Sequence, residues 1–156
     1  MRGYIGLTTT EWIEFIQRNT SCDKAVFWCK KKSFRALNMG EPFYFLRRGK
    51  FSSNADRYIL GYASFLRFEK MSVIDAWERY KTALGFEDNS SYLDSIKNIY
   101  GNCDFELGCI VLNKPVFFMS GVSLAACNID FSPCIVSGKT ITDEECSQII
   151  SISRRQ

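Results

Sequence analysis

The chain has 156 residues, of which 46% are hydrophobic and 24% are charged, a balance typical of a globular domain rather than a disordered segment. Its formal net charge is only +3, and it contains no histidine. Zinc hydrolases, serine and cysteine triads and HNH-type nucleases all use imidazole as a base or a ligand, so the composition excludes these hydrolytic classes. We therefore expect a binding protein without catalytic residues. Carboxylate chemistry at Glu11, Asp23 or Glu41 is the alternative.

The first half of the chain predicts three strands and one helix. Residues 2–7 are expected to form a strand, and the capping-box pattern Thr8-Thr9-Thr10-Glu11 opens a helix that ends near Arg18. The β-branched and aromatic side chains of residues 25–29 predict a second strand. The continuous apolar run at residues 43–46 predicts a third strand that is buried on both faces.

A long central strand and two helices are predicted next. Residues 58–68 alternate between two faces, and Gly61 marks a bulge. Ser72-Val73-Ile74-Asp75 is a second capping-box pattern, and it precedes an apolar helical stripe that ends near Gly85. Residues 91–100 carry another helical stripe.

The last third of the chain returns to strands before a final helix. Two strands are expected at residues 108–112 and 116–119, with a turn or bend between them. Thr142 to Glu145 should cap a short helix that runs through Ile150. This order of elements predicts an α+β fold, with a curled sheet or open barrel of five to six strands and flanking helices.

No apolar run approaches the roughly 20 residues that span a bilayer, and the N-terminus lacks the apolar region of a signal peptide. The seven cysteines form no CxxC pair, so we expect reduced thiols, several of them buried, and no metal site. We expect one domain over residues 1–156 that works in the cytoplasm, away from membranes, and needs no cofactor.

Seven cations lie between residues 30 and 50 against a single acidic residue. Such a cluster attracts phosphates through counterion release, although a run of charge is also typical of a solvated surface. The predicted phosphate-binding set consists of this cluster and one residue near the C-terminal end: Lys30, Lys31, Lys32, Arg35, Arg47, Arg48, Lys50 and Lys139.

The segment Phe27-Trp28-Cys29 runs directly into the basic loop. A base removed from its stack needs aromatic faces to replace the lost stacking and nearby cations to hold the distorted backbone. Because neighbouring residues of a strand face opposite sides, we expect Phe27 in the core and Trp28 in a pocket. Trp12, in the first turn of a helix, fits either the core or an anion site, and Trp77 is expected in the core.

The segment Ser137-Gly138-Lys139-Thr140 is similar to the end of a phosphate-binding P-loop. The first glycine of that motif is missing because Ser132 occupies its place, so nucleotide hydrolysis is not predicted. Gly138 and Lys139 fit a turn that contacts phosphate, and they fit an ordinary surface turn equally well.

Over nearly the whole chain a series of short motifs occurs in a fixed order: Gly3-Tyr4-Ile5-Gly6-Leu7-Thr8, Glu11-Trp12, Val26-Phe27-Trp28, Phe34-Arg35-Ala36-Leu37, Gly40-Glu41-Pro42-Phe43, Gly61-Tyr62, Ala76-Trp77-Glu78, Gly108-Cys109-Ile110 and Ile135-Val136-Ser137-Gly138-Lys139-Thr140. This series resembles the N-terminal PUA-like domain of HNH-type, modification-dependent restriction endonucleases. The resemblance implies a PUA-like fold related to EVE, YTH, ASCH and SRA domains. These domains hold a flipped or modified base in an aromatic pocket on a curved sheet.

In YTH domains a strand that ends in a Trp-Cys step supplies one wall of the base pocket. Trp28-Cys29 is similar, so the resemblance implies that Trp28 is one wall of a pocket here. The second wall is open among four aromatic residues: Trp12, Phe34, Tyr62 and Phe65.

The full-length family members carry an HNH module, which this chain lacks because it has no histidine. The resemblance therefore implies a reading domain that acts with a nuclease domain in cis or in trans. We predict a DNA-binding specificity module of a restriction or defence system that reads a modified base by flipping it, with 5-methyl- or 5-hydroxymethylcytosine the best fit.

Three alternatives remain open for the function. The first is a reader of RNA bases. The second is a sensor of a nucleotide-like small molecule or a protein-interaction domain, in which the basic face is merely solvated. The third and least favoured is a base-excising glycosylase, which would need a carboxylate beside the pocket, and Asp23 is the nearest candidate in sequence.

Overall fold

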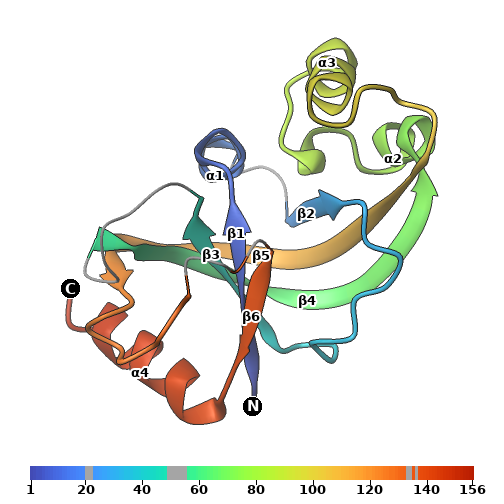
Figure 1. The fold of residues 1–156 in the computed structure, drawn as a ribbon. Helices are drawn as coiled ribbons and strands as arrows, with labels where there is room; N and C mark the ends of the chain where they lie inside the picture. The colour runs from blue at the N-terminus through green and yellow to red at the C-terminus, as the bar shows by residue number, and fades with distance from the viewer. Residues whose placement is uncertain (20–22, 49–55, 133–134, 136) are drawn as a thin grey trace.

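The computed structural model describes residues 1–19, 23–48, 56–132, 135 and 137–156. Its described strands form one six-stranded sheet in the order β2-β5-β4-β3-β1-β6 (Figure 1). β1 and β3 run parallel, and the other neighbouring strands run antiparallel. The sheet is curled but not closed, because β2 and β6 remain at its two edges. The strands are β1 (Gly3–Thr8), β2 (Lys24–Cys29), β3 (Pro42–Arg47), β4 (Tyr58–Ser72), β5 (Glu106–Ser123) and β6 (Gly138–Ile141).

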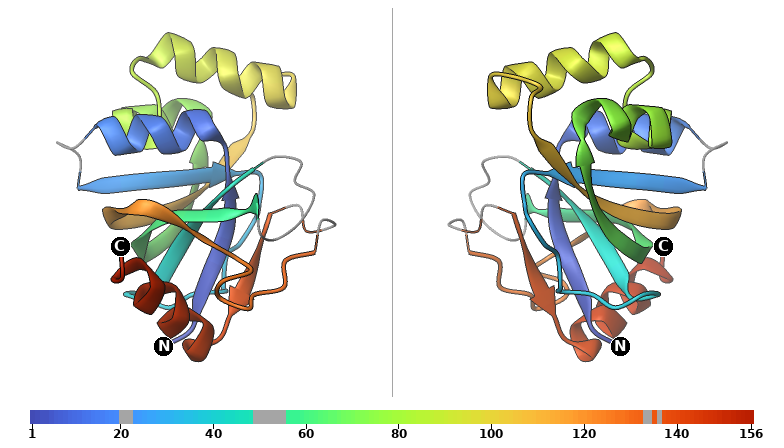
Figure 2. Two further views of the ribbon diagram at one scale, coloured as in Figure 1. Left: turned by 90° about the vertical axis from the view of Figure 1, so that its left-hand side faces the viewer. Right: turned by 90° about the vertical axis from the view of Figure 1, so that its right-hand side faces the viewer.

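Side chains cap the helices, and the predicted caps at Ser72 and Thr142 are confirmed, whereas the first helix is capped by Thr9 rather than by Thr8, the first residue of the predicted capping box. The hydroxyl oxygens of Thr9 and Ser72 accept from the backbone N–H groups of Trp12 and Asp75, and Thr142 forms a complete capping box with Glu145. The helices are α1 (Thr10–Arg18), α2 (Val73–Tyr80), the 3₁₀-helix η2 (Lys81–Leu84), α3 (Asn89–Tyr100) and α4 (Asp143–Ser153). Figure 2 shows α1, α2 and α3 near β2, and α4 near both termini.

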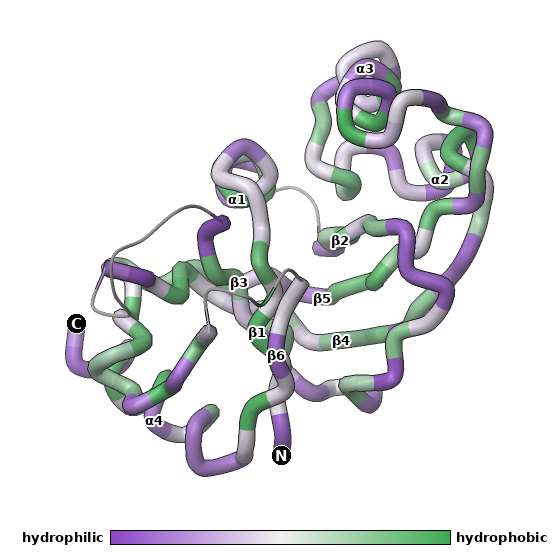
Figure 3. Tube along the Cα trace, viewed as in Figure 1, coloured by the Kyte–Doolittle hydropathy of each residue, from purple (hydrophilic) through white to green (hydrophobic). Residues whose placement is uncertain are grey.

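Hydrophobic side chains gather in three clusters around the sheet, and hydrophobic stretches run along β3, β4 and β5 (Figure 3). The first cluster joins one face of the sheet to α1 and includes Phe43 and Phe45. The second lies under α4 and includes Tyr44 and Ile149. The third lies under α2, η2 and α3. The four residues 43–46 of β3 are fully or nearly fully buried, which confirms the expectation that this strand is covered on both faces.

Three features of the fold differ from the expectation. Residues 106–123 form one continuous strand rather than two. In place of the expected turn or bend there is an irregularity within the strand, where Lys114 takes a positive φ of 53° and the pairing register with β4 shifts. The strand predicted to end at Phe68 continues to Ser72. Gly138 and Lys139, interpreted as a turn, are the first two residues of strand β6, which pairs with β1.

The bulge predicted at Gly61 is confirmed, because the register between β4 and β5 shifts between Ile59 and Gly61. The thiols Cys29, Cys103, Cys109, Cys127 and Cys146 are free, and the last three are buried. Among the described residues no group of three or more His, Cys, Asp or Glu could hold a metal ion. No helix in the described part of the chain is long and apolar enough to cross a membrane.

Candidate functional site

A cavity of about 650 Å³ lies where α1, the edge strand β2 and the end of η2 with α3 meet. Figures 1 and 2 show α1 and α3 on the same side of β2. Five of the lining residues are aromatic, while one acid, one arginine and the hydroxyl groups of Thr9, Ser95 and Tyr100 supply the polar groups. The lining residues are Leu7, Thr9, Glu11, Trp12, Phe27, Trp28, Arg48, Gly85, Phe86, Ser95, Ile99 and Tyr100.

The parallel pairing of β1 and β3 places two segments at the same end of the sheet. β1 leads into the N-terminus of α1, which brings Thr9 and Glu11 to the cavity. β3 leads to Arg48, whose backbone N–H donates to the Thr8 carbonyl over 2.7 Å. The cavity is therefore bounded on this side by the start of a helix and by a cation.

Trp28 lies near the end of β2, on the face covered by η2 and α3. Its indole N–H donates to the Leu84 carbonyl over 2.9 Å, and its ring centroid lies 6.0 Å from that of Phe86 and 6.5 Å from that of Tyr100. The side chain is only partly buried, and it lines the cavity. Because its N–H is already bound, Trp28 offers the cavity an aromatic surface rather than a donor.

Trp12 is 6% exposed and belongs mainly to the core. Its indole N–H donates to the Val26 carbonyl over 3.2 Å, and its ring meets those of Phe27 and Phe45 edge to face. A Cβ built on Gly85 would lie 2.3 Å from Trp12 Cδ1. Trp12 therefore packs against the turn that follows η2, and that turn lies between the two tryptophans.

The helical wall of the cavity is fixed to the rest of the fold by several polar contacts. The Tyr92 hydroxyl donates to the Val73 carbonyl over 2.7 Å, and its ring stacks on Trp77 with 5.5 Å between centroids. The Glu69 carboxylate on β4 accepts from the Tyr80 hydroxyl and forms an ion pair with Arg79 over 3.2 Å. α2 and α3 are thus held on the sheet, and Trp77 is a packing residue as expected.

Two cations lie close to the aromatic residues of the cavity. Lys30 Nζ is 4.9 Å from the ring centroid of Tyr100 and 4.5 Å from that of Phe105. Burial, followed by the nearby Cys29 thiol, raises the pKa of Tyr100, while Arg48 acts in the opposite direction. The electrostatic influence of Arg48 thus reaches Tyr100, and both cations lie near the helical wall.

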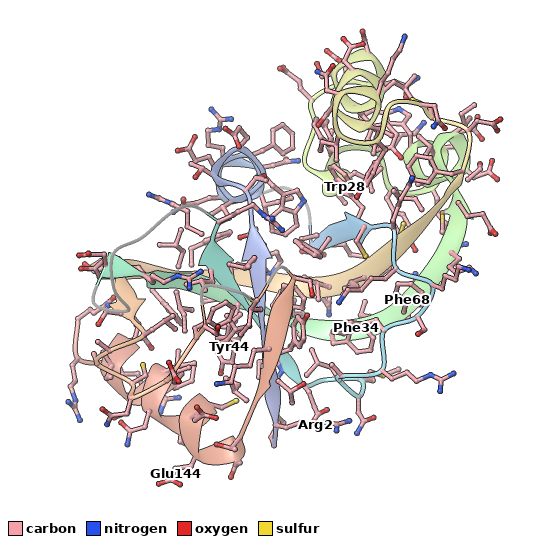
Figure 4. All side chains as sticks on the ribbon, viewed as in Figure 1. Arg2, Trp28, Phe34, Tyr44, Phe68 and Glu144 are labelled. Atoms are coloured by element: carbon pink, nitrogen blue, oxygen red, sulfur yellow. The ribbon has the colours of Figure 1, made fainter. Side chains whose placement is uncertain are left out.

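The structure brings some of the predicted aromatic residues to this cavity and not others. Trp28 and Trp12 line it, and so does Phe27, which packs at the edge of the core as well. Phe34 and Phe65 do not line it, because both are buried in the first cluster with their rings 5.5 Å apart. Figure 4 shows Phe34 well away from Trp28.

Tyr62 lies on another surface. It lines a second cavity of about 620 Å³ beside α4, where its ring is 5.7 Å from that of Tyr44. Arg154 and Arg155 also line this second cavity, and the N-terminal amine of the chain forms an ion pair with Asp143 there over 2.8 Å. The four candidates for the second wall are therefore divided among three places, and Trp12 alone among them shares the cavity of Trp28.

The predicted phosphate-binding residues are spread over several surfaces. Arg48 lines the cavity, and Lys30 lies beside it. Lys31 Nζ lies 5.9 Å from the ring centroid of Tyr4, and Lys139 on β6 donates to the Asp130 carbonyl over 2.5 Å. Exposed positions without a cavity contact are Lys32, Arg35 and Arg47, while Lys50 lies outside the described residues.

Sequence reasoning did not place Phe86, Ser95 and Tyr100 at the site. Tyr100 closes the predicted stripe at residues 91–100, but no local pattern indicates that α3 folds back against β2. Glu11, named from the sequence only as a candidate for carboxylate chemistry, lines the cavity. Asp23, the other nearby acid, precedes β2 at the end opposite Trp28 and does not line the cavity.

The cavity can hold a planar group between aromatic surfaces, with hydrogen-bonding side chains at one side and cations nearby. Its adjacent thiol is poorly suited to nucleophilic attack, because burial raises the pKa of Cys29. Burial likewise raises the pKa of Cys109 to about 12. The geometry is therefore that of a binding site for a flat, polar-edged ligand.

The sequence matches no protein-family model and no curated protein, but solved structures share its fold. ASCH from Zymomonas mobilis matches with a TM-score of 0.65 and 16% sequence identity, covering 96% of this chain and 94% of that one. Human THYN1 in complex with DNA containing 5-methylcytosine matches with a TM-score of 0.56 and 10% identity, covering 100% and 99%. A hypothetical protein from Leishmania major matches with a TM-score of 0.58 and 9% identity, covering 100% and 96%. The fold is α+β and PUA-like.

Proposed function

We propose that this chain binds nucleic acid by taking a single base into the cavity between α1 and α3. The observation that carries the proposal is the position of Trp28, which lies partly buried in an aromatic cavity with its N–H already bound to Leu84. A base is flat, and its faces stack on aromatic side chains, so each base stacked in this way contributes about 1–3 kcal/mol. Extruding the base from a duplex costs a few kcal/mol, which stacking in the cavity offsets.

The cations near the cavity fit a strand that approaches it. Arg48 lines the cavity and Lys30 lies against Tyr100, so phosphates on either side of an inserted base would find positive charge within reach. Lys32, Arg35 and Arg47 are exposed but line neither cavity, so the proposed phosphate contacts rest on Arg48 and Lys30. Phosphate contacts of this kind position the strand and carry no sequence information.

We propose that the base is a modified cytosine in DNA. Human THYN1, which shares this fold, has been solved with DNA containing 5-methylcytosine, and this supports the same class of ligand here. The cavity of about 650 Å³ is large enough for a pyrimidine with a substituent on its ring. The chain then acts by binding alone, and a nuclease domain in cis or in trans supplies cleavage in a cytoplasmic restriction system.

A binding panel tests this function. Matched duplexes carrying unmodified, methylated, hydroxymethylated or glucosylated cytosine are titrated with the protein at one fixed salt concentration, and a matched RNA is included. We expect tighter binding to one modified duplex than to the unmodified duplex, and an affinity that falls steeply as salt is raised. Equal affinity for all four duplexes would refute the reading of a modified base, and preference for the RNA would favour an RNA reader.

A further inference from the structure

The polar groups of the cavity decide which edge of a base it accepts. Both tryptophans already use their indole N–H groups, Trp12 with the Val26 carbonyl and Trp28 with the Leu84 carbonyl. Their faces remain, and an aromatic face stacks on every base with little selectivity. Recognition of the base edge therefore falls to the few other polar side chains that line the cavity: Thr9, Glu11, Arg48, Ser95 and Tyr100.

Glu11 differs from the others because its ionised carboxylate can only accept hydrogen bonds and cannot donate them. It lies in the first turn of α1, where the partial positive charge of the helix N-terminus stabilises a carboxylate. Its side chain is exposed and makes no hydrogen bond or ion pair with the described residues. Thr9, by comparison, already accepts from the Trp12 backbone N–H over 3.3 Å. The Glu11 carboxylate is thus available to a ligand.

A reader of methylated cytosine in DNA faces one particular competitor, which is thymine. Thymine carries a methyl group at the same ring carbon as 5-methylcytosine, so the two bases present nearly the same shape to the aromatic walls. They differ on the edge, where cytosine has a donating N4 amino group and thymine has an accepting O4 oxygen. A carboxylate accepts from the amino group and repels the oxygen.

We propose that Glu11 is the specificity-determining residue that distinguishes 5-methylcytosine from thymine, through a hydrogen bond from the N4 amino group to its carboxylate. This assignment rests on the proposed base-reading function and adds the direction of the base to it. The Watson–Crick edge points toward the N-terminus of α1, while Trp28 lies against the face of the ring.

The test compares a duplex with 5-methylcytosine opposite guanine and the same duplex with thymine opposite guanine. The mismatch makes thymine easier to extrude, so this bias works against the expected result. The wild-type protein should nevertheless prefer 5-methylcytosine by about five- to 150-fold, the usual range for one good contact to a base edge. Glu11→Gln should reduce the preference to about threefold or less, since an amide can donate to O4 as well as accept from N4.

Glu14→Gln is the matched control, because Glu14 is exposed on the same helix, carries the same charge and does not line the cavity. It should keep the wild-type preference. A wild-type preference that Glu11→Gln leaves intact would overturn the role of Glu11 while leaving base reading in place. If wild type binds both duplexes equally, but more tightly than the unmodified duplex, the role of Glu11 is likewise overturned while base reading stays in place. If wild type binds none of the three duplexes, the base-reading function and this assignment are overturned together.

Discussion

Replacing Gly85 by alanine tests the contact that joins the two aromatic walls of the cavity. Gly85 has a φ of +99°, and a Cβ there would lie 2.3 Å from Trp12 Cδ1 and 2.9 Å from Trp12 Nε1. A left-handed backbone costs a non-glycine residue about 1–2 kcal/mol. Overpacking against a buried side chain adds about 1–3 kcal/mol. We therefore expect Gly85→Ala to lower the free energy of unfolding by about 2–5 kcal/mol.

Gly101→Ala separates these two contributions. Gly101 has a φ of +86°, but a Cβ there would meet no atom within 4 Å, so only the backbone cost of about 1–2 kcal/mol applies. Urea denaturation followed by tryptophan fluorescence measures both variants against the wild type. Equal losses for the two variants would refute the packing of Trp12 on the turn after η2. A loss at Gly85 that exceeds the loss at Gly101 by about 1–3 kcal/mol would support it.

Three other perturbations address the site and the core. Trp28→Ala should weaken binding of the preferred oligonucleotide by about 1–3 kcal/mol, while Trp28→Phe, which keeps one aromatic ring but loses the second ring and the bond to Leu84, should weaken it less. Titration by fluorescence anisotropy compares the two, and equal weakening would contradict stacking on the ring at position 28. Arg48→Ala should lower the affinity for all sequences alike and reduce the salt slope by about 1, whereas Lys139→Ala, on β6 and outside both cavities, should leave the slope unchanged. A slope that stays the same in Arg48→Ala would remove this residue from the phosphate contacts. Burial raises the pKa of the Cys127 thiol to about 11 from an unfolded value of 9.0, so the folded protein keeps a proton that the unfolded chain releases, and stability should fall as pH rises through 9 to 11. Melting temperatures should therefore decline over this range, less steeply in Cys127→Ala, and an identical decline in both proteins would contradict the assignment.

The elements of the fold that could be predicted are those with local signals. Each of the helices α2 and α4 is capped by a hydroxyl residue that the local sequence pattern predicts. The structure shows that the hydroxyl oxygen accepts from the backbone N–H three residues later in both helices. The buried run at 43–46 has no polar alternation, and it is a strand buried on both faces as expected. In these cases the information lies within one stretch of about four residues.

Features that depend on distant partners could not be predicted. β6 is only Gly138–Ile141, and it is a strand because β1, from the other end of the chain, pairs with it. The register shift between Phe65 and Arg67 breaks the alternation of β4, so Phe65 and Phe68 pack in the same cluster although a regular strand would place them on opposite faces.

The candidate site was predicted in part for the same reason. Trp28 could be singled out because an aromatic strand end precedes the basic loop, and the structure shows that it lines a cavity with Arg48. The opposite wall comes from the turn at Gly85 and from Tyr100, which the chain reaches only after two helices. No residue near Trp28 in sequence indicates that wall. Strands β3 and β4 and the helices α2 and η2 separate Trp28 from α3 along the chain.

The most direct test of the account is a two-dimensional NMR titration that follows the three indole N–H signals. The chain has three tryptophans, of which Trp28 and Trp12 line the cavity while Trp77, on α2, stacks on Tyr92 of α3. Each signal is assigned by a Trp→Phe variant. Addition of a duplex with 5-methylcytosine should shift the Trp28 and Trp12 signals and leave the Trp77 signal in place. Saturated binding that shifts the Trp77 signal alone, or none of the three, would contradict a base bound between α1 and α3.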